Sequence, residues 1–411
     1  MLVFSTLVDY TAARVIEAAK KPWIRQTSLL VSLTLNLGLL FTFKYADFFS
    51  DSAFTLIGIR PWPELNWVLP LGISFYTFQT MSYTIDVYRG AIAAKRSILD
   101  VAIYVCFFPQ LIAGPIVRSD ELIPQLEARA SVDWRQIRGG IAQILWGIFK
   151  KVYIADPMAH IANEAFASPD MVSGVGLILA AYAFAIQIYC DFSGYSDVAI
   201  GSAKLLGIRL PQNFDAPYLA CSIRDFWRRW HITLSTWLRD YLYIPLGGNR
   251  KGPVRTYANL MITMLLGGLW HGAGWTWVIW GGLQGFLLSV ERAMKWERTP
   301  KNIFWRAVRW VITFHLICLS WIFFRVNNFQ DAVTILQRVG GLASGYIPLD
   351  FRPIAVLGLI LLIERLKLKQ GWTLWFQEKP KFTKWVTIAS AIALFFTFAG
   401  ASNPEFIYFQ F

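Results

Sequence analysis

Charged residues are scarce in this sequence of 411 residues: Lys, Arg, Asp and Glu make up 16% of it, and hydrophobic residues make up 55%. Soluble globular domains carry about a quarter charged residues, so the deficit excludes an ordinary soluble protein. The mean hydropathy is correspondingly high, at +0.43. We therefore expect an all-α, multi-pass membrane protein, in which each span needs about 20 mostly apolar residues.

Cysteine is also rare, and several catalytic motifs are absent. The four cysteines are scattered in or beside apolar segments without the spacing of metal ligands, so we expect buried free thiols and no metal site. The sequence has no phosphate-binding Walker loop, no Gly-x-Ser-x-Gly elbow and no zincin helix. The chemistry left open is histidine-based acyl or proton transfer in a water-poor membrane cavity.

Acidic residues are outnumbered by basic ones, 26 against 39, which gives a net charge of +13. In a soluble protein such an excess would suggest nucleic acid binding. Here the basic residues collect in the segments that connect apolar runs, as the positive-inside rule describes. We therefore expect membrane lipid as a partner and no nucleic acid.

About ten segments are candidates for membrane spans, and residues 1–18 read as an amphipathic helix without the features of a signal peptide. The third candidate contains Pro109 and the Gly114-Pro115 pair, so we expect it to be bent against protein or re-entrant. The candidates are 27–43, 67–81, 101–117, 141–154, 172–189, 259–269, 275–290, 307–324, 354–363 and 385–398.

Residues 191–257 differ from the rest because they combine many aromatic and charged residues without an apolar run long enough to span. No internal repeat of 20 to 50 residues and no inverted halves are visible. We predict a single membrane domain, residues 1–411, in which 191–257 is a polar, aromatic-rich insertion.

A helix is expected to begin within this insertion at Ser222, because Ser222 and Asp225 have the spacing of a capping box. It should run to about Tyr243, before Pro245 and a pair of glycines. On such a helix His231 shares one face with Trp227, Trp230 and Trp237. This face either belongs to an interfacial helix with snorkelling arginines or lines a buried cavity that positions His231.

His271 is the one ionisable side chain in the glycine-studded apolar stretch 265–288. Ionisable residues inside membrane spans are costly and mark function by default. Gly268 with Gly272, and Gly281 with Gly285, are small-xxx-small pairs that bring helices close together without any chemistry. Packing explains these glycines but leaves the histidine unexplained, so a catalytic role for His271 is a hypothesis of equal weight.

A third polar cluster, residues 191–197, directly follows an apolar run. Asp191 and Ser193 either cap the next helix or form hydrogen bonds across the core. His160, close to Asp156, and His315, alone in a predicted span, are expected to be structural.

Four motifs carry a family resemblance: DFSGYSDVAIG at 191–201, NFDAPY at 213–218, DFWRRWHITLSTWLRDYLYIPLGGNRKG at 225–252 and LLGGLWHGAGWTWVIWGGLQG at 265–285. Together they resemble the membrane-bound O-acyltransferase family, and within it the branch with the integral-membrane subunit of bacterial alginate O-acetylation. Segments 72–90 and 107–118 fit this branch too. Its members usually carry more hydrophobic sequence before the region that matches 2–43.

The resemblance implies a ring of about ten spanning and tilted helices around a central tunnel, with 191–257 supplying a cytosolic funnel. The two signature polar residues of the family fall on His271 and His231, which are the expected catalytic residues. His271 would act as general base or carry the acyl group, and His231 would orient a substrate or stabilise an oxyanion. The expected substrate-binding residues are Trp227, Trp230, Arg228, Arg229, Arg239, Asp191, Ser193, Asn213 and Trp275.

The function implied is transfer of an acetyl group from a cytosolic thioester, acetyl-coenzyme A, for O-acetylation of an extracellular polysaccharide such as alginate. No bound cofactor is expected. The arginines would attract the phosphates of the donor, and a periplasmic acetyltransferase partner would complete the transfer from the bacterial inner membrane. The alternatives are transfer of a D-alanyl or other acyl group to teichoic acid or peptidoglycan, and a transporter with His271 as a proton relay.

Overall fold

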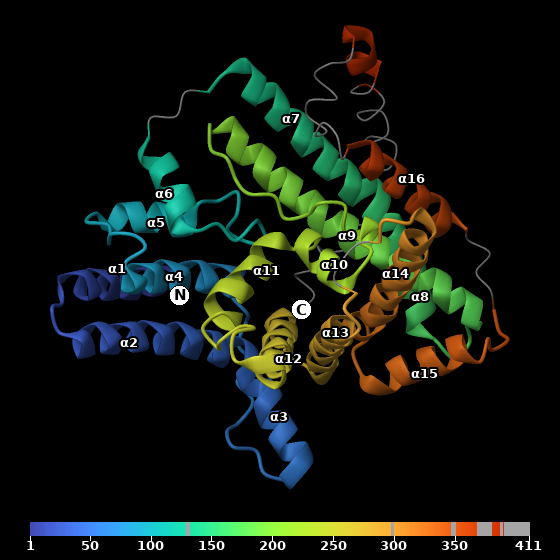
Figure 1. Cartoon of the computed structure of the whole chain (residues 1–411), viewed down its shortest axis with the longest axis horizontal. Coiled ribbons are helices and arrows are strands. Elements are labelled where there is room, and N and C mark those ends of the chain that lie inside the picture. The colour runs from blue at the N-terminus through green and yellow to red at the C-terminus, as the bar shows by residue number, and fades with distance from the viewer. Residues whose placement is uncertain (129–131, 297–299, 347–350, 368–379, 387–388, 390–411) are drawn as a thin grey trace. The chain divides into compact units, whose positions relative to one another are not determined.

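The structure, a computed structural model, describes residues 1–128, 132–296, 300–346, 351–367, 380–386 and 389 (Figure 1). Within these ranges it consists of helices and their connections, with one isolated β-bridge between Val172 and Tyr346. The all-α prediction is confirmed. Backbone contacts divide the chain into two compact units, Met1–Gly140 with Ala199–Pro211, and Ile141–Val198 with Gln212–Phe411.

Helices α1, α2 and α4 pack against one another in the first unit (Figure 1). The α2 helix continues through a π-helical turn, Phe41–Tyr45, into α3. The helices that lie entirely in this unit are α1 (Leu2–Ala18), α2 (Pro22–Leu40), α3 (Ala46–Ile57), α4 (Ile73–Arg89), α5 (Ile98–Cys106) and α6 (Ser119–Glu127).

The α1 helix turns its polar side inward. Asp9 is fully buried, and its carboxylate accepts hydrogen bonds from Ser32, from Asn36 at 3.0 Å and from Thr84 at 3.0 Å. Four large apolar side chains of the same helix are exposed, and Val3 is 70% exposed, although Ile16 is buried. This arrangement is suited to a lipid environment, in which polar groups must find their hydrogen-bond partners inside the protein.

The second unit contains α8 and α10 to α16, while α7 and α9 each have one end in the first unit. Its core is formed by buried residues of α8, α9, α10, α13 and α14. The bounds are α7 (Trp134–Phe149), α8 (Asp156–Ala167), α9 (Gly174–Leu205), α10 (Ile223–Arg229), α11 (Ile232–Leu238), α12 (Gly252–His271), α13 (Trp275–Ala293), α14 (Ile303–Arg325), α15 (Phe329–Gly340) and α16 (Arg352–Lys367).

Three described stretches are long and apolar enough to cross a membrane: Pro22–Ile57, Gly174–Leu205 and Ile303–Arg325. Other predicted spans begin or end elsewhere. The helix expected at 67–81 starts at Ile73, and the one expected at 101–117 ends at Cys106, so the break before Gly114-Pro115 is confirmed. The last predicted span, 385–398, lies mostly outside the described residues. Of the four free thiols, Cys106 is exposed, contrary to expectation.

The prediction that Asp191 and Ser193 cap a helix is wrong, because α9 runs through both residues. The alternative of bonds across the core is what the structure has. Lys151 pairs with Asp191 at 2.7 Å, and Lys150 donates to Ser193 at 2.7 Å and pairs with Asp197 at 2.7 Å. The lysines can reach α9 because α7 approaches it closely where Gly147 meets Gly194.

The α12 and α13 helices pack side by side in the second unit (Figure 1). A Cβ atom on Gly268 would lie 2.3 Å from the Trp277 carbonyl oxygen, and one on Gly281 would lie 2.3 Å from the Met264 carbonyl oxygen. Backbone therefore packs on backbone at both positions, as predicted from the small-xxx-small pairs. The contact fixes the end of α12, where His271 is the last residue.

We expect Gly281→Ala to destabilise the protein by about 1–3 kcal/mol, because the added methyl group overpacks a contact made of backbone. Gly282→Ala is the matched control, since a Cβ there meets only the Leu265 side chain at 3.4 Å. Thermal unfolding in detergent measures both. If the two variants unfold at the same temperature, the close contact of α12 and α13 contributes nothing to stability.

Candidate active site

Two histidines meet in the second unit. The ring centroids of His231 and His271 are 6.3 Å apart, although 40 positions separate them in the sequence. Their exposed fractions are 0% and 5%. The structure thus brings together the two residues that the sequence predicted as catalytic, in a place where water has little access.

Aromatic rings surround this histidine pair. Phe192 of α9 lies edge-on to His231 at 4.6 Å, and Trp270 lies 5.9 Å from it. In such a cage the local dielectric is low, so hydrogen bonds and partial charges act strongly on a bound substrate. The rings around His271 are Trp270, Trp277, Trp280 and Phe324, with centroids 5.0 to 6.2 Å away.

The helix predicted from Ser222 to Tyr243 begins as expected but is interrupted at His231. Ser222 accepts the N–H of Asp225 at 3.0 Å, which confirms the N-cap, while the Asp225 carboxylate accepts the N–H of Cys221 at 3.4 Å in place of that of Ser222. The α10 helix then ends at Arg229, and His231 takes a left-handed conformation with φ 41° before α11 begins. A continuous helix to Tyr243 is therefore wrong, and His231 lies in the break.

Asn213 is the physical reason for this break. Its backbone carbonyl accepts the N–H of Ile232 at 2.9 Å, and its side-chain oxygen accepts the Thr233 hydroxyl at 2.7 Å. The N–H of Asp215 donates in turn to the Arg229 carbonyl. Segment 213–215 thus replaces the helical hydrogen bonds on both sides of His231. Asn213 is predicted to bind substrate, and in the structure it is 1% exposed and bonded to Ile232 and Thr233.

Burial lowers the pKa of His231 to about 3, from an ordinary value of 6.5. The ring is neutral at physiological pH, so one of its nitrogens carries a proton and the other accepts. The unfolded chain takes up a proton below about pH 6.5, whereas the folded protein does not until the pH approaches 3. Folding stability is therefore lost as the pH falls through this window.

We expect the free energy of unfolding to be about 2 kcal/mol lower at pH 5 than at pH 7 through His231 alone, at about 1.4 kcal/mol per pH unit below 6.5. His231→Asn should remove this part of the acid sensitivity, because asparagine tolerates the left-handed conformation and does not titrate. Chemical unfolding in detergent across this pH range tests it. An unchanged pH dependence in the variant would rule out His231 as the source.

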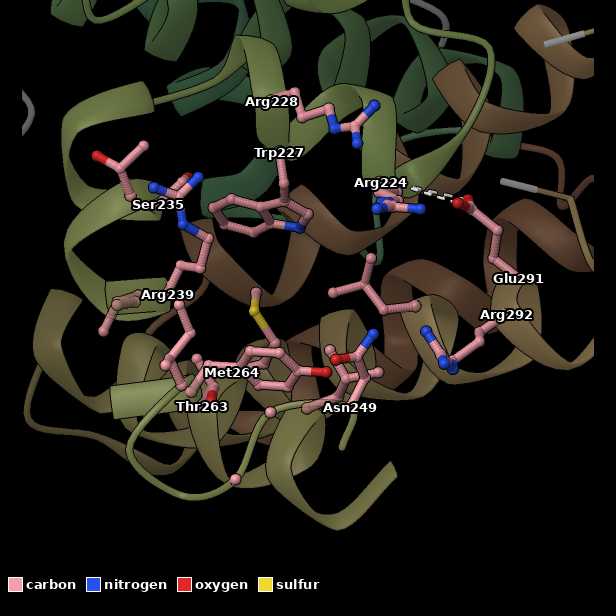
Figure 2. Close-up of a pocket in the computed structure, with 18 of the residues that line it drawn as sticks. Arg224, Trp227, Arg228, Ser235, Arg239, Asn249, Thr263, Met264, Glu291 and Arg292 are labelled. Atoms are coloured by element: carbon pink, nitrogen blue, oxygen red, sulfur yellow. Dashed lines mark hydrogen bonds between the residues drawn. The ribbon is translucent and has the colours of Figure 1, made fainter. Parts of the chain in front are cut away.

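A cavity of about 670 Å³ lies beside α10, α11, η4 (Arg239–Tyr243), α12 and α13. Five arginines line it, four of which Figure 2 shows around Trp227. The single carboxylate in the lining, Glu291, accepts the N–H groups of Ile223 and Arg224. The cavity is therefore strongly positive and suits a polyanion. The arginines are Arg224, Arg228, Arg239, Arg250 and Arg292.

Tryptophan connects the cavity to the histidines. The ring of Trp227, which lines the cavity, lies 5.9 Å from that of Trp280, and Trp280 lies 5.3 Å from His271. The cavity also touches Met264, two helical turns before His271 on α12. Two layers of indole thus separate the positive cavity from the histidine pair.

The other predicted substrate-binding residues are distributed unevenly. Trp227, Arg228 and Arg239 line the cavity, and Arg239 also pairs with Asp240 at 2.6 Å. Arg229 lies outside the lining and pairs with Asp225 at 2.9 Å. Trp230 is 1% exposed in the core. Trp275, at the start of α13, is 54% exposed.

Sequence reasoning missed five residues of this region: Arg224, Arg250, Arg292, Gln284 and Glu291. The three arginines are part of the general basic excess of the sequence, and nothing in their spacing indicates that they converge. Gln284 and Glu291 are polar residues in or at the end of a predicted span. Polar residues inside membrane spans indicate function, and this signal singles out Gln284 as well as His271.

A second cavity, of about 320 Å³, borders α8. Phe324 contacts His271 at 5.3 Å, and its neighbour Arg325 donates to Asn163 of α8 at 2.5 Å. The charges in its lining are mixed, unlike those of the arginine cavity. The lining includes His160, Glu164, Ser168, Tyr346 and Arg352.

A buried histidine pair beside an arginine-lined cavity thus defines a histidine site in an all-helical membrane protein. Comparison of the sequence with known proteins identifies its family. The family model of the membrane-bound O-acyltransferases matches residues 22–330. The chain belongs to this family.

Two similar proteins carry acetylation in their names. The chain is 47% identical to a probable alginate O-acetylase of Azotobacter vinelandii over 75% of this chain and 61% of the relative. It is 41% identical to a peptidoglycan O-acetyltransferase of Helicobacter pylori over 83% of this chain and 70% of the relative. A teichoic acid D-alanyltransferase of Bacillus subtilis is 28% identical, over 65% of this chain and 71% of the relative. The chain thus spans about three fifths of the length of the alginate relative.

Proposed function

We propose that the chain forms the membrane-embedded part of an O-acetyltransferase. It takes an acetyl group from a cytosolic thioester, acetyl-coenzyme A, and transfers it toward an acceptor beyond the bacterial inner membrane, for O-acetylation of an extracellular polysaccharide. The names of the alginate and peptidoglycan relatives support this function. The observation that carries it is the buried His231–His271 pair, two indole layers away from an arginine-lined cavity.

The arginine cavity is the proposed donor site. Coenzyme A carries several phosphate groups, and guanidinium groups bind phosphate through paired, charge-assisted hydrogen bonds. Of the predicted phosphate-binding arginines, Arg228 and Arg239 line the cavity, and Arg224, Arg250 and Arg292 join them. With the phosphates held here, the thioester end of the donor would extend past Trp227 toward His271.

The proposed reaction joins a hydroxyl oxygen to the acetyl carbon. His271, as general base, takes the proton of the attacking hydroxyl, the C–O bond forms, the C–S bond breaks, and the proton passes to the leaving thiolate. In the covalent variant, a His271 nitrogen displaces the thiolate and carries the acetyl group to the hydroxyl. Neutral His231 donates its N–H to the oxyanion that forms on the carbonyl.

The acceptor would approach through the second cavity, which borders α8, the helix whose Asn163 accepts a hydrogen bond from Arg325 beside Phe324. Its mixed lining suits a neutral, hydroxyl-rich group better than a polyanion. A ring of about ten helices around a tunnel, with 191–257 as a cytosolic funnel, is the arrangement that would connect the two openings. A periplasmic acetyltransferase partner would then complete transfer to the polysaccharide.

D-alanyl transfer to teichoic acid is the second candidate, favoured by the similarity to the Bacillus subtilis protein. At 28% identity this similarity is weaker than the 41% and 47% to the two O-acetylating relatives. Acetyl transfer therefore remains the proposed reaction.

We expect His271→Ala to lower acetyl transfer by at least about 10²-fold, the usual contribution of a general base, while the protein still folds. Transfer of radiolabelled acetyl groups from acetyl-coenzyme A in membranes measures this. His315→Ala is the control, because His315 is engaged with Tyr182 and the Val311 carbonyl on α14. Activity retained in the His271 variant would refute the central role of this residue.

We expect Arg292→Gln to raise the KM for acetyl-coenzyme A by about tenfold, since a charge-assisted bond to phosphate is worth about 1.5 kcal/mol. The effect should shrink at high ionic strength. Arg255→Gln is the matched control, an exposed arginine on α12 outside the cavity. If Arg292→Gln has the same KM for acetyl-coenzyme A as Arg255→Gln, the donor does not bind in this cavity.

A further inference from the structure

Trp227 lies between the arginine cavity and the aromatic rings around His271. Its orientation therefore affects whether a ligand in the cavity can reach His271. It belongs to α10, a helix of only seven residues. Isolated helices of this length are unstable in water, and α10 ends just before the left-handed residue His231. Its position must therefore be set by contacts with other elements.

The first such contact is Gln284 on α13, which is 1% exposed. Its side-chain oxygen accepts the indole N–H of Trp227 at 3.1 Å, and its amide group donates to the Ser320 hydroxyl at 2.8 Å. Ser320 in turn donates to the Ile317 carbonyl of α14 at 2.7 Å. The amide of Gln284 is thus held in one orientation, with its oxygen directed at Trp227.

The second contact lies two turns further along α13. Glu291, 6% exposed, accepts the N–H groups of Ile223 and Arg224 at 2.5 and 3.2 Å. These N–H groups belong to the first turn of α10, which has no partners for them within the helix. Figure 2 shows Glu291 directed at Arg224 across the edge of the cavity.

We infer that Gln284 and Glu291 are positioning residues for the donor site. Spaced seven residues apart on α13, they attach α10 at its side chain Trp227 and at its first turn. The attachment fixes Trp227, Arg224 and Arg228 relative to the histidine pair, because α13 also carries Trp280, which contacts His271. This inference rests on the proposed function for the nature of the donor, but the attachment itself does not.

Kinetics of the purified, full-length protein provide the first test. Gln284→Ala is expected to raise the KM for acetyl-coenzyme A by about five- to tenfold, the equivalent of one hydrogen bond of about 1–1.4 kcal/mol, with a smaller change in kcat. A residue that only stabilised the fold would lower the amount of active protein and leave KM unchanged. Ser289→Ala is the matched control, since Ser289 lies on α13 and its hydroxyl donates to the Gly285 carbonyl of the same helix.

A double-mutant cycle separates action through Trp227 from other effects. Trp227→Phe removes the indole N–H and keeps an aromatic ring. If Gln284 acts through this N–H, then Gln284→Ala raises KM in the unaltered protein and has little further effect in the Trp227→Phe background. An equal rise in both backgrounds would overturn the assignment of Gln284.

Hydrogen exchange tests Glu291 without any assay of transfer. The amides of Ile223 and Arg224 should exchange about tenfold faster in Glu291→Ala, and Glu291→Gln, which keeps an acceptor oxygen, should restore part of the protection. Unchanged exchange in Glu291→Ala would overturn this half of the inference. If the unaltered protein does not transfer acetyl groups, the proposed function fails while the exchange result still decides whether α13 holds α10.

Discussion

The backbone contact between α12 and α13 is the constraint on which the rest of the site depends. Gly268 and Gly281 leave no room for a side chain at this crossing, so the relative position of the two helices is set by the main chain itself. His271 stands at the end of α12. A histidine placed in this way does not rely on flexible neighbours for its location.

From this contact, one face of α13 organises the whole region. Residues three, four and seven positions apart share a helix face, and on this face Trp280 meets His271, Gln284 holds Trp227 and Glu291 holds the start of α10. The face extends from the histidine pair to the arginine cavity. The geometry of the histidine pair and the shape of the arginine cavity therefore both depend on contacts made by α13.

The sequence predicted features that depend on local signals. The cap at Ser222 was correct because a hydroxyl and an acid three residues apart act on their own helix. The end of α10 could not be predicted, because the break at His231 depends on hydrogen bonds with the backbone of Asn213 and Asp215. No glycine or proline near His231 indicates this break in the sequence. The role of Asp191 was ambiguous for the same reason, since its partner Lys151 is 40 residues away. Convergence of five arginines on one cavity likewise requires the tertiary fold.

The buried carboxylate of Asp9 makes α1 dependent on its neighbouring helices. A carboxylate carried into a bilayer on a single helix costs about 2.5–3.5 kcal/mol on insertion scales. Two partners of Asp9, Ser32 and Asn36, belong to α2, and only residues 19–21 separate the helices. The α1 and α2 helices therefore depend on each other, because separating them would leave the Asp9 carboxylate without Ser32 and Asn36, and Thr84 of α4 adds a further hydroxyl to the same carboxylate.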